Sequence, residues 1–193
     1  MTSLNSSTPK DIFDLIERDD VKGVRNYWNV HHIDDEHEEL YERTILGWVA
    51  RNFTGGLCKA ILDNEADPNL KNGEGQSPLY WAASTANVET LSVLLKAGAD
   101  INVRDKDDST LFHALANHPQ SSKAIVFMEV LVEKGFSLID GIDKDGDTAL
   151  HIAAIAINFD TVKYLLSEGA KWNIRNNLGK TPDDYVSHNP EEG

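Results

Sequence analysis

The chain has 193 residues, with 18 Lys and Arg against 32 Asp and Glu, so its formal net charge is −14. This length favours a single domain, and 40% hydrophobic with 26% charged residues excludes a wholly disordered chain. The acid excess argues against nucleic acids and anionic bilayers as partners, because both need clustered Lys and Arg. A protein partner with a basic surface is the electrostatic expectation.

The N-terminal 38 residues are predicted to form a flexible arm, a pair of capping helices and an acidic loop. Residues 1–8 are rich in Ser, Thr and Asn, without the basic and apolar runs of a signal peptide. The sequence Thr8-Pro9-Lys10-Asp11 is a capping box, which predicts a helix from about Pro9. Residues 21–28 are predicted as its partner helix. The remainder of 9–38 is read as an acidic loop.

A repeat of about 33 residues organises the remainder of the chain. Hydroxyl residues that open apolar stretches lie 33, 33, 38 and 33 residues apart, at Thr44, Ser77, Thr110, Thr148 and Thr181. The stretches after them read TILGWVA, SPLYWAA, TLFHALA, TALHIAA and TPDDYVS. At a fixed offset follow ILDNEADPN, LLKAGADIN, LVEKGFSLI and LLSEGAKWN. The repeat predicts structurally equivalent units that stack on one another.

Each unit carries the signals of two helices and a turn. Ser77-Pro78 is an N-cap followed by a residue with helical φ. An apolar stripe predicts a second, amphipathic helix in the same unit, at Val88, Leu91, Leu94 and Leu95. Gly98 follows the stripe where a left-handed residue usually ends a helix. The Asp- and Asn-rich stretch 100–108 is predicted as a tight turn toward the next unit, called a finger below.

These units resemble ankyrin repeats, whose family pattern is close to D-x-x-G-x-T-P-L-H-x-A-A followed by L-L-x-x-G-A-D-x-N. The closest matches are SPLYWAA with LLKAGADIN and DGDTALHIAA with LLSEGA. The resemblance implies an all-α solenoid of helix–turn–helix–finger units. It assigns residues 9–38 to an N-terminal cap and 176–193 to a partial C-terminal repeat and tail, with four full repeats between them at 39–71, 72–104, 105–142 and 143–175.

Three departures from the family pattern predict local differences. The unit 105–142 is five residues longer than its neighbours, and its turn-like residues 118–122 predict an extended connection between its two helices. Its finger, FSLIDGID, lacks the Gly-Ala-Asp turn. Glu42 and Glu65 stand where the family has Gly, so those two joints are expected to be strained or differently turned.

Four other motifs partly resemble metal- or nucleotide-binding sites. Asp143–Asp147 resembles the start of a calcium loop, but Thr148 and Ala154 occupy the places of its required Gly and Glu. Gly73-Glu74-Gly75 and Gly179-Lys180-Thr181 are incomplete nucleotide-binding motifs. The acidic loop holds His31, His32 and His37, which either bind zinc or, as we favour, lie in a solvated loop able to dock a basic segment.

His113 and His151 stand at the histidine position of the family pattern, where the resemblance implies a structural role. No nucleophile or oriented carboxylate lies at a spacing that would make either residue a catalytic base. No catalytic residue, metal ligand or cofactor is therefore predicted. The most apolar stretch, 149–159, is too short to span a bilayer. The single cysteine, Cys58, fits a reducing compartment. A cytoplasmic location is expected, with the nucleus or delivery into a host cell as alternatives.

The resemblance implies a non-catalytic protein–protein interaction module, monomeric by itself, that binds its partner through a concave face of finger tips and inner helices. The alternative is a dedicated inhibitor, chaperone or host-directed effector acting on one basic protein. An enzyme is the least favoured class. The family's variable positions predict these partner-binding residues: Tyr41, Arg43, Arg51, Asn52, Glu74, Gln76, Ser84, Thr85, Lys106, Asp107, Ser109, Asn117, His118, Lys144, Asp145, Asp147 and Ile155.

Overall fold

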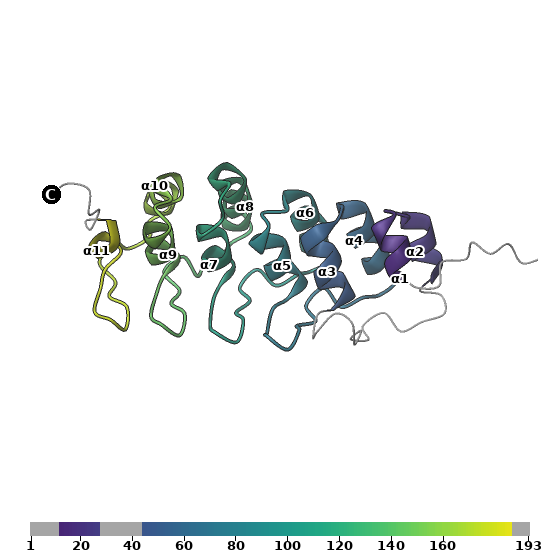
Figure 1. The fold of residues 1–193 in the computed structure, drawn as a ribbon, viewed down its shortest axis with the longest axis horizontal. Coiled ribbons are helices and arrows are strands. Elements are labelled where there is room, and N and C mark those ends of the chain that lie inside the picture. The colour runs from purple at the N-terminus through teal and green to yellow at the C-terminus, as the bar shows by residue number, and fades with distance from the viewer. Residues whose placement is uncertain (1–11, 28–43, 187–193) are drawn as a thin grey trace, which may run out of the picture.

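The computed structural model describes residues 12–27 and 44–186 as an elongated row of helix pairs (Figure 1). The predicted arm, the acidic loop with its three histidines, and Tyr41 and Arg43 lie outside the described residues. The helices of the described part are α1 (Ile12–Glu17), α2 (Val21–Tyr27), α3 (Ile45–Asn52), α4 (Gly55–Leu62), α5 (Pro78–Ser84), α6 (Val88–Lys96), α7 (Leu111–Ala116), α8 (Ser121–Glu133), α9 (Ala149–Ile155), α10 (Phe159–Ser167) and α11 (Asp183–Val186).

Each predicted full repeat contains one inner and one outer helix. The inner helices α3, α5, α7 and α9 pack on one another in order, as do the outer helices α4, α6, α8 and α10. The pair α1–α2 packs on the N-terminal end through α4, and the one-turn α11 packs on α9. The fingers project from one side of the row (Figure 1). The all-α repeat solenoid is therefore confirmed, since the described residues hold only two isolated bridges, Arg104–Thr110 and Ile142–Thr148.

The helices begin where the sequence places hydroxyl and amide side chains. Thr44 accepts a hydrogen bond from the amide of Gly47, and Ser77 accepts one from the amide of Tyr80. These contacts satisfy amides that have no partner within the helix. Asn87 caps α6 in the same way, and its side-chain amide also donates to the carbonyls of Ala50 and Phe53 in the preceding unit. The cap thus also joins two units.

One continuous core runs along the row. Small buried residues on the inner helices, such as Ala82, Ala83, Ala116 and Ala153, allow these helices to pack closely. Trp81 of α5 lies against the preceding unit, because a Cβ placed on Gly47 of α3 would lie 3.1 Å from its indole ring. No single unit encloses a hydrophobic core of its own. The units therefore stack, because stacking buries their apolar faces.

The predicted extended connection in the unit 105–142 is wrong. The connection 117–120 is only one residue longer than 85–87, whereas α8 has 13 residues and α6 has nine. The insertion lengthens the outer helix because Ser121 and Ser122 are tolerated in a first helical turn and an apolar stripe continues after them. That stripe has the i, i+3, i+4, i+7 spacing of a buried helix face: Ala124, Phe127, Met128 and Leu131. The turn after α8 is formed normally, with Gly135 at φ 90°.

Candidate protein-binding face

The finger tips share one loop geometry that sequence reasoning missed. The residues that build it recur at equivalent positions, Asn72, Asp105, Asp143 and Asn176. The side-chain Oδ1 of each accepts hydrogen bonds from the amides two and four residues later, at 2.9–3.1 Å. Such Asx turns fix a tight loop without a regular element. The signal in the sequence was Asn or Asp recurring at the spacing of the repeat itself.

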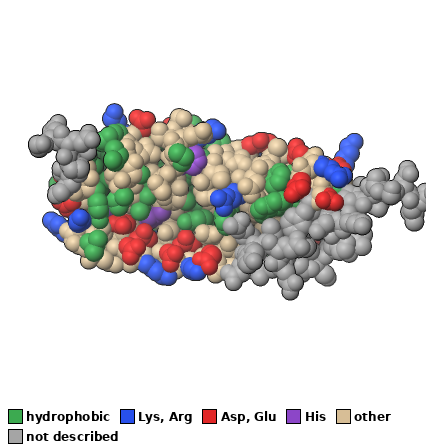
Figure 2. Space-filling view, in the orientation of Figure 1, with side chains coloured by type: hydrophobic (Ala, Val, Ile, Leu, Met, Phe, Trp, Pro, Cys, Tyr) green, Lys and Arg blue, Asp and Glu red, His purple; other side chains and the backbone are tan. Residues whose placement is uncertain are grey.

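Adjacent finger tips are joined by their backbones. The amides of Lys106, Lys144 and Asn177 donate to the carbonyls of Glu74, Asp107 and Asp145, each at 2.9 Å. The close approach explains Gly75, because a Cβ there would lie 2.8 Å from the amide nitrogen of Lys106. The tips therefore form one continuous edge along the array, and an acidic and a basic residue alternate along it (Figure 2).

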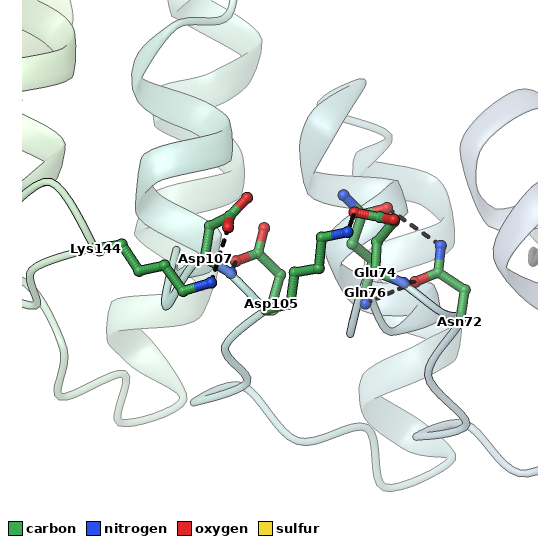
Figure 3. Close-up of polar contacts among 7 residues, drawn as sticks. Asn72, Glu74, Gln76, Asp105, Asp107 and Lys144 are labelled. Atoms are coloured by element: carbon green, nitrogen blue, oxygen red, sulfur yellow. Dashed lines mark hydrogen bonds and ion pairs between the residues drawn. The ribbon is translucent and has the colours of Figure 1, made fainter.

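Ion pairs reinforce the first two joints of this edge. The ammonium of Lys106 pairs with Glu74, and that of Lys144 lies 3.1 Å from Asp107 Oδ1 (Figure 3). Both pairs are exposed, so each contributes only about 0–1 kcal/mol to stability. They nevertheless reduce the negative charge that Glu74 and Asp107 were predicted to offer to a partner.

Asn177 replaces the lysine at the third joint. Its side-chain amide donates to the carbonyl of Lys144, at 2.8 Å. The carboxylate of Asp145 therefore has no hydrogen bond or ion pair within the described part of the chain, whereas the neighbouring Asp147 accepts one from Asn176 at 2.7 Å. Of the four predicted acidic residues on the finger tips, Asp145 is the one left available.

Two other predicted residues at the tips also serve the loops. Gln76 Oε1 accepts from the side-chain amide of Asn72 at 3.2 Å, as drawn in Figure 3. The amide of Ser109 donates to Asp105. The first contact occupies the side-chain oxygen of Gln76, whereas the second holds only the backbone of Ser109.

The inner-helix histidines are structural. The imidazole Nδ1 of His113 and that of His151 each accept from the amide of the N-cap threonine at 3.1 Å. Their Nε2 atoms lie 2.9 and 3.1 Å from the carbonyls of Asp147 and Lys180 in the following finger. With both nitrogens of each ring occupied, neither residue is placed to act as a general base. Burial lowers the pKa of His113, which favours its neutral form.

Tyr80 occupies the equivalent position in the unit 72–104. Burial raises the pKa of its phenol above the usual range, as do the charge of Asp105 and the hydrogen bond to it. The phenol therefore ties an inner helix to the next finger, as the histidine rings do in the following units.

The C-terminal ends of the inner helices α3 and α5 contact each other, so several predicted binding residues there also join the two units. The Arg51 guanidinium lies 4.7 Å from the centroid of the Trp81 ring, a cation–π arrangement between α3 and α5. The hydroxyl of Thr85 donates to the carbonyl of Arg51 at 3.2 Å. The remaining two predicted residues here make local bonds, Ser84 to the carbonyl of Trp81 and Asn52 to that of Trp48.

The later helix ends present more free surface. Asn117 is exposed, and the ring of His118 accepts from the amide of Gln120 at 3.1 Å. The carbonyl of His118 also accepts from Asn158 at 3.3 Å, which joins two units. Ile155 ends α9 with 49% of its surface exposed. Ile155 and Asp145 belong to the same unit, so an apolar and an acidic feature stand on one repeat.

Neither a metal-ligand cluster nor an activated thiol is found in the described part of the chain. No group of three or more His, Cys, Asp and Glu side chains able to hold a metal ion occurs among the described residues. Burial raises the pKa of the Cys58 thiol to about 12, so the reactive thiolate is scarce at neutral pH. Within the same ranges, no helix combines the length and apolar character needed to cross a bilayer.

The family model for ankyrin repeats, described as three copies, matches residues 19–105, 45–126 and 94–176. This chain belongs to the ankyrin-repeat family. Members of the family are generally non-catalytic and act as protein–protein interaction modules. The helices, caps and fingers described above are the structural counterpart of that match.

Curated relatives carry similar repeats within longer proteins. The chain is 36% identical over 130 residues to a mitochondrial disaggregase from Bos taurus, which covers 65% of the chain and 18% of that protein. It is 34% identical over 144 residues to the E3 ubiquitin-protein ligase KEG from Arabidopsis thaliana, covering 70% and 8%. It is 34% identical over 94 residues to the ankyrin repeat protein OPG189 of Variola virus, covering 49% and 16%. The chain thus spans less than a fifth of the length of these relatives.

Proposed function

We propose that this ankyrin array is a non-catalytic binding module for a partner protein that presents a cationic side chain beside an apolar one. The partner contacts what we call the finger–helix face: the finger tips 72–76, 105–109 and 143–147 with the C-terminal ends of α5, α7 and α9. We also propose that the module acts in the cytoplasm, as expected from the sequence.

The observation that carries the proposal is the pairing pattern along the fingers. Glu74 and Asp107 are each paired with a lysine of the next finger, whereas Asp145 is not. A partner cation therefore gains most at Asp145, where no internal lysine competes for the carboxylate. Ile155 adds an exposed apolar contact on the same unit. Among the sequence-predicted residues, these two are best placed to bind.

The test compares charge reversal on the two sides of the array. Asp145→Lys is expected to slow association with the partner about 2- to 5-fold, since exposed charge pairs contribute about 0.2–1 kcal/mol. Ile155→Ser is expected to weaken binding about tenfold or more if Ile155 is buried at the centre of the contact. The control is Glu129→Lys on the outer helix α8, an exposed acidic residue away from the fingers.

Binding partners are captured from extract of the source cell with the wild type and the three variants, and are quantified by mass spectrometry. A partner whose captured amount falls with Asp145→Lys and falls further with Ile155→Ser, but is unchanged with Glu129→Lys, supports the proposal. Equal losses with all three variants would indicate nonspecific charge attraction. Loss with Glu129→Lys alone would move the site to the outer helices.

A further inference from the structure

The C-terminal end of the array exposes an apolar surface, which we call the C-terminal face: Ile157, Phe159, Val162, Leu166, Trp172 and Val186. All of these except the half-buried Val162 are exposed. The large exposed hydrophobic residues of the described ranges all lie between Val126 and Val186. Figure 2 shows hydrophobic side chains gathered at this end of the molecule.

On the side of the outer helices, the C-terminal face is a stacking surface on which no described outer helix packs, although α11 covers part of α9. In the unit 72–104 the equivalent positions hold Ala86, Val88, Leu91, Leu95 and Ile101, all of which are buried or half-buried. Leu95 and Ile101 line the same hollow as Val130 of the next outer helix, α8. Their counterparts Leu166 and Trp172 have no following outer helix among residues 44–186, because only the one-turn α11 comes after α10.

A groove opens in this face between α9, α10 and α11. Its walls are apolar apart from one phenol, and they are formed by Ala153, Ala154, Ile157, Phe159, Val162, Tyr185 and Val186. Terminal repeats of a solenoid usually present a polar outer surface, which keeps the array soluble. An apolar end of this extent is instead typical of an interface.

The backbone conformation of Ile157 also indicates that the C-terminal face is an interface. Ile157 adopts φ 54° in the left-handed region, where β-branched residues are rare and strained. Ala86 holds the equivalent turn with φ 48° and is buried, whereas Ile157 is 64% exposed. Neither the turn nor the core of the folded chain benefits from isoleucine here. A strained and exposed isoleucine at this position favours a contact outside the chain.

The charge distribution identifies the occupant. The whole chain carries −14, yet residues 159–186 contain four acidic and four basic residues and are therefore neutral. A basic partner has no electrostatic reason to choose this end. Two copies of the chain, by contrast, meet here without the repulsion that their net charge causes elsewhere.

We infer that two copies of the chain associate end to end, each contributing its C-terminal face to a two-fold interface. The described part of the opposite end does not complement this face: α1, α2 and the turn between them expose charged residues, Asp14, Glu17, Arg18, Asp19, Asp20 and Lys22. Head-to-tail growth is therefore disfavoured, and a closed dimer is the symmetric solution. The inferred dimer differs from the monomer expected from the sequence.

The available area predicts a weak dimer. The five exposed residues of the C-terminal face are two aromatic residues, of about 150–250 Å² each, and three smaller aliphatic ones; at 39–64% exposure they offer on the order of 500 Å² per copy. Two copies thus bury roughly 1,000 Å², the lower limit for a specific interface. An interface this small is typical of weak association, and we expect a dissociation constant in the micromolar range, roughly 1–100 µM.

Sedimentation equilibrium of the full chain, from about 1 to 500 µM, tests the inference. The wild type is expected to dimerise, and Phe159→Glu and Leu166→Glu are each expected to raise the dissociation constant at least about tenfold. Phe159→Glu is compatible with folding, because an acidic residue suits the first turn of α10. The control is Val126→Glu: Val126 is exposed on α8, at the position equivalent to the acidic residues Glu89 of α6 and Asp160 of α10.

Melting curves followed by circular dichroism establish that the variants remain folded, and X-ray scattering determines the geometry. An end-to-end dimer nearly doubles the maximum dimension of the particle. A chain that stays monomeric at every concentration overturns the inference, and so does a dimer that keeps the maximum dimension of the monomer. Equal disruption by Val126→Glu overturns it as well. None of these outcomes bears on the Asp145 and Ile155 tests.

Discussion

Glu65 follows helix α4 with φ 70°, in the left-handed region that Gly98, Gly135 and Gly169 occupy after the later outer helices. A residue with a Cβ is strained there by about 1–2 kcal/mol. We therefore predict that Glu65→Gly raises the free energy of unfolding by about 0.5–1 kcal/mol, part of the gain being offset by the greater freedom of glycine in the unfolded chain. Urea unfolding measures the change.

The matched control for Glu65 is Gly98→Ala. A Cβ at Gly98 would meet no atom within 4 Å, so only the backbone conformation opposes alanine. This variant is expected to lose about 1 kcal/mol. If both substitutions left stability unchanged, the left-handed geometry after α4 would not be the source of strain.

His113 makes the array sensitive to mild acid. Burial lowers its pKa in the folded state below the ordinary value of 6.5, so below about pH 6.5 the unfolded chain takes up a proton first. The free energy of unfolding is therefore expected to fall as the pH drops from 7.5 to 5.5. His113→Gln should be less stable at pH 7.5 but lose less on acidification. A variant with the same pH slope as the wild type would contradict this assignment.

The Asx turns are expected to stabilise the finger loops. Asp143→Ala removes the acceptor for the amides of Asp145 and Asp147 and is predicted to cost about 1–3 kcal/mol of unfolding free energy. Asp143→Asn should restore most of it, since Asn72 and Asn176 build the same loop. Thermal or urea unfolding measures both. Asp145→Ala is the neighbouring control, with an expected change within about 0.5 kcal/mol; a cost equal to that of Asp143→Ala would refute the loop's role.

Two adjacent leucines show which side of an outer helix is packed. Leu165 is fully buried in α10, whereas Leu166 is exposed. Leu165→Ala is predicted to lower the free energy of unfolding by roughly 2–5 kcal/mol, because it leaves a cavity between α10 and its neighbours. Leu166→Ala should cost less than about 1 kcal/mol when unfolding is followed at concentrations where the chain is monomeric. Similar losses for both variants would mean that α10 is rotated from the orientation described.

The described residues form a linear array, because the main contacts between helices run within a unit or between neighbouring units. A compact protein of this length would have a radius of gyration of about 16 Å. X-ray scattering at low concentration is expected to give a clearly larger radius, and circular dichroism a predominantly helical spectrum. A radius near the compact value would be incompatible with the row of helices in Figure 1.

The sequence by itself determined the repeat, the family and the all-α architecture. These follow from local signals that recur at the repeat spacing: caps such as Ser77, stripes such as that ending at Leu94, and turns such as Gly98. The structural role of His113 and His151 was also predictable from their position in the pattern. Caps, apolar stripes and turns depend on residues within one unit. The sequence of one unit therefore predicts the same features in the others.

Only the tertiary structure decided which surface is available. The sequence marked Glu74, Asp107 and Asp145 alike as acidic tips, but pairing with the next finger depends on a residue more than 30 positions away. The same holds for Leu95 and Leu166, which differ in burial because one has a following unit packed on it and the other has none described. The insertion in 105–142 lengthened a helix because buried contacts extended along it. The exposure of a side chain and its ion pairs depend on contacts between units. The sequence pattern of a single unit therefore does not predict them.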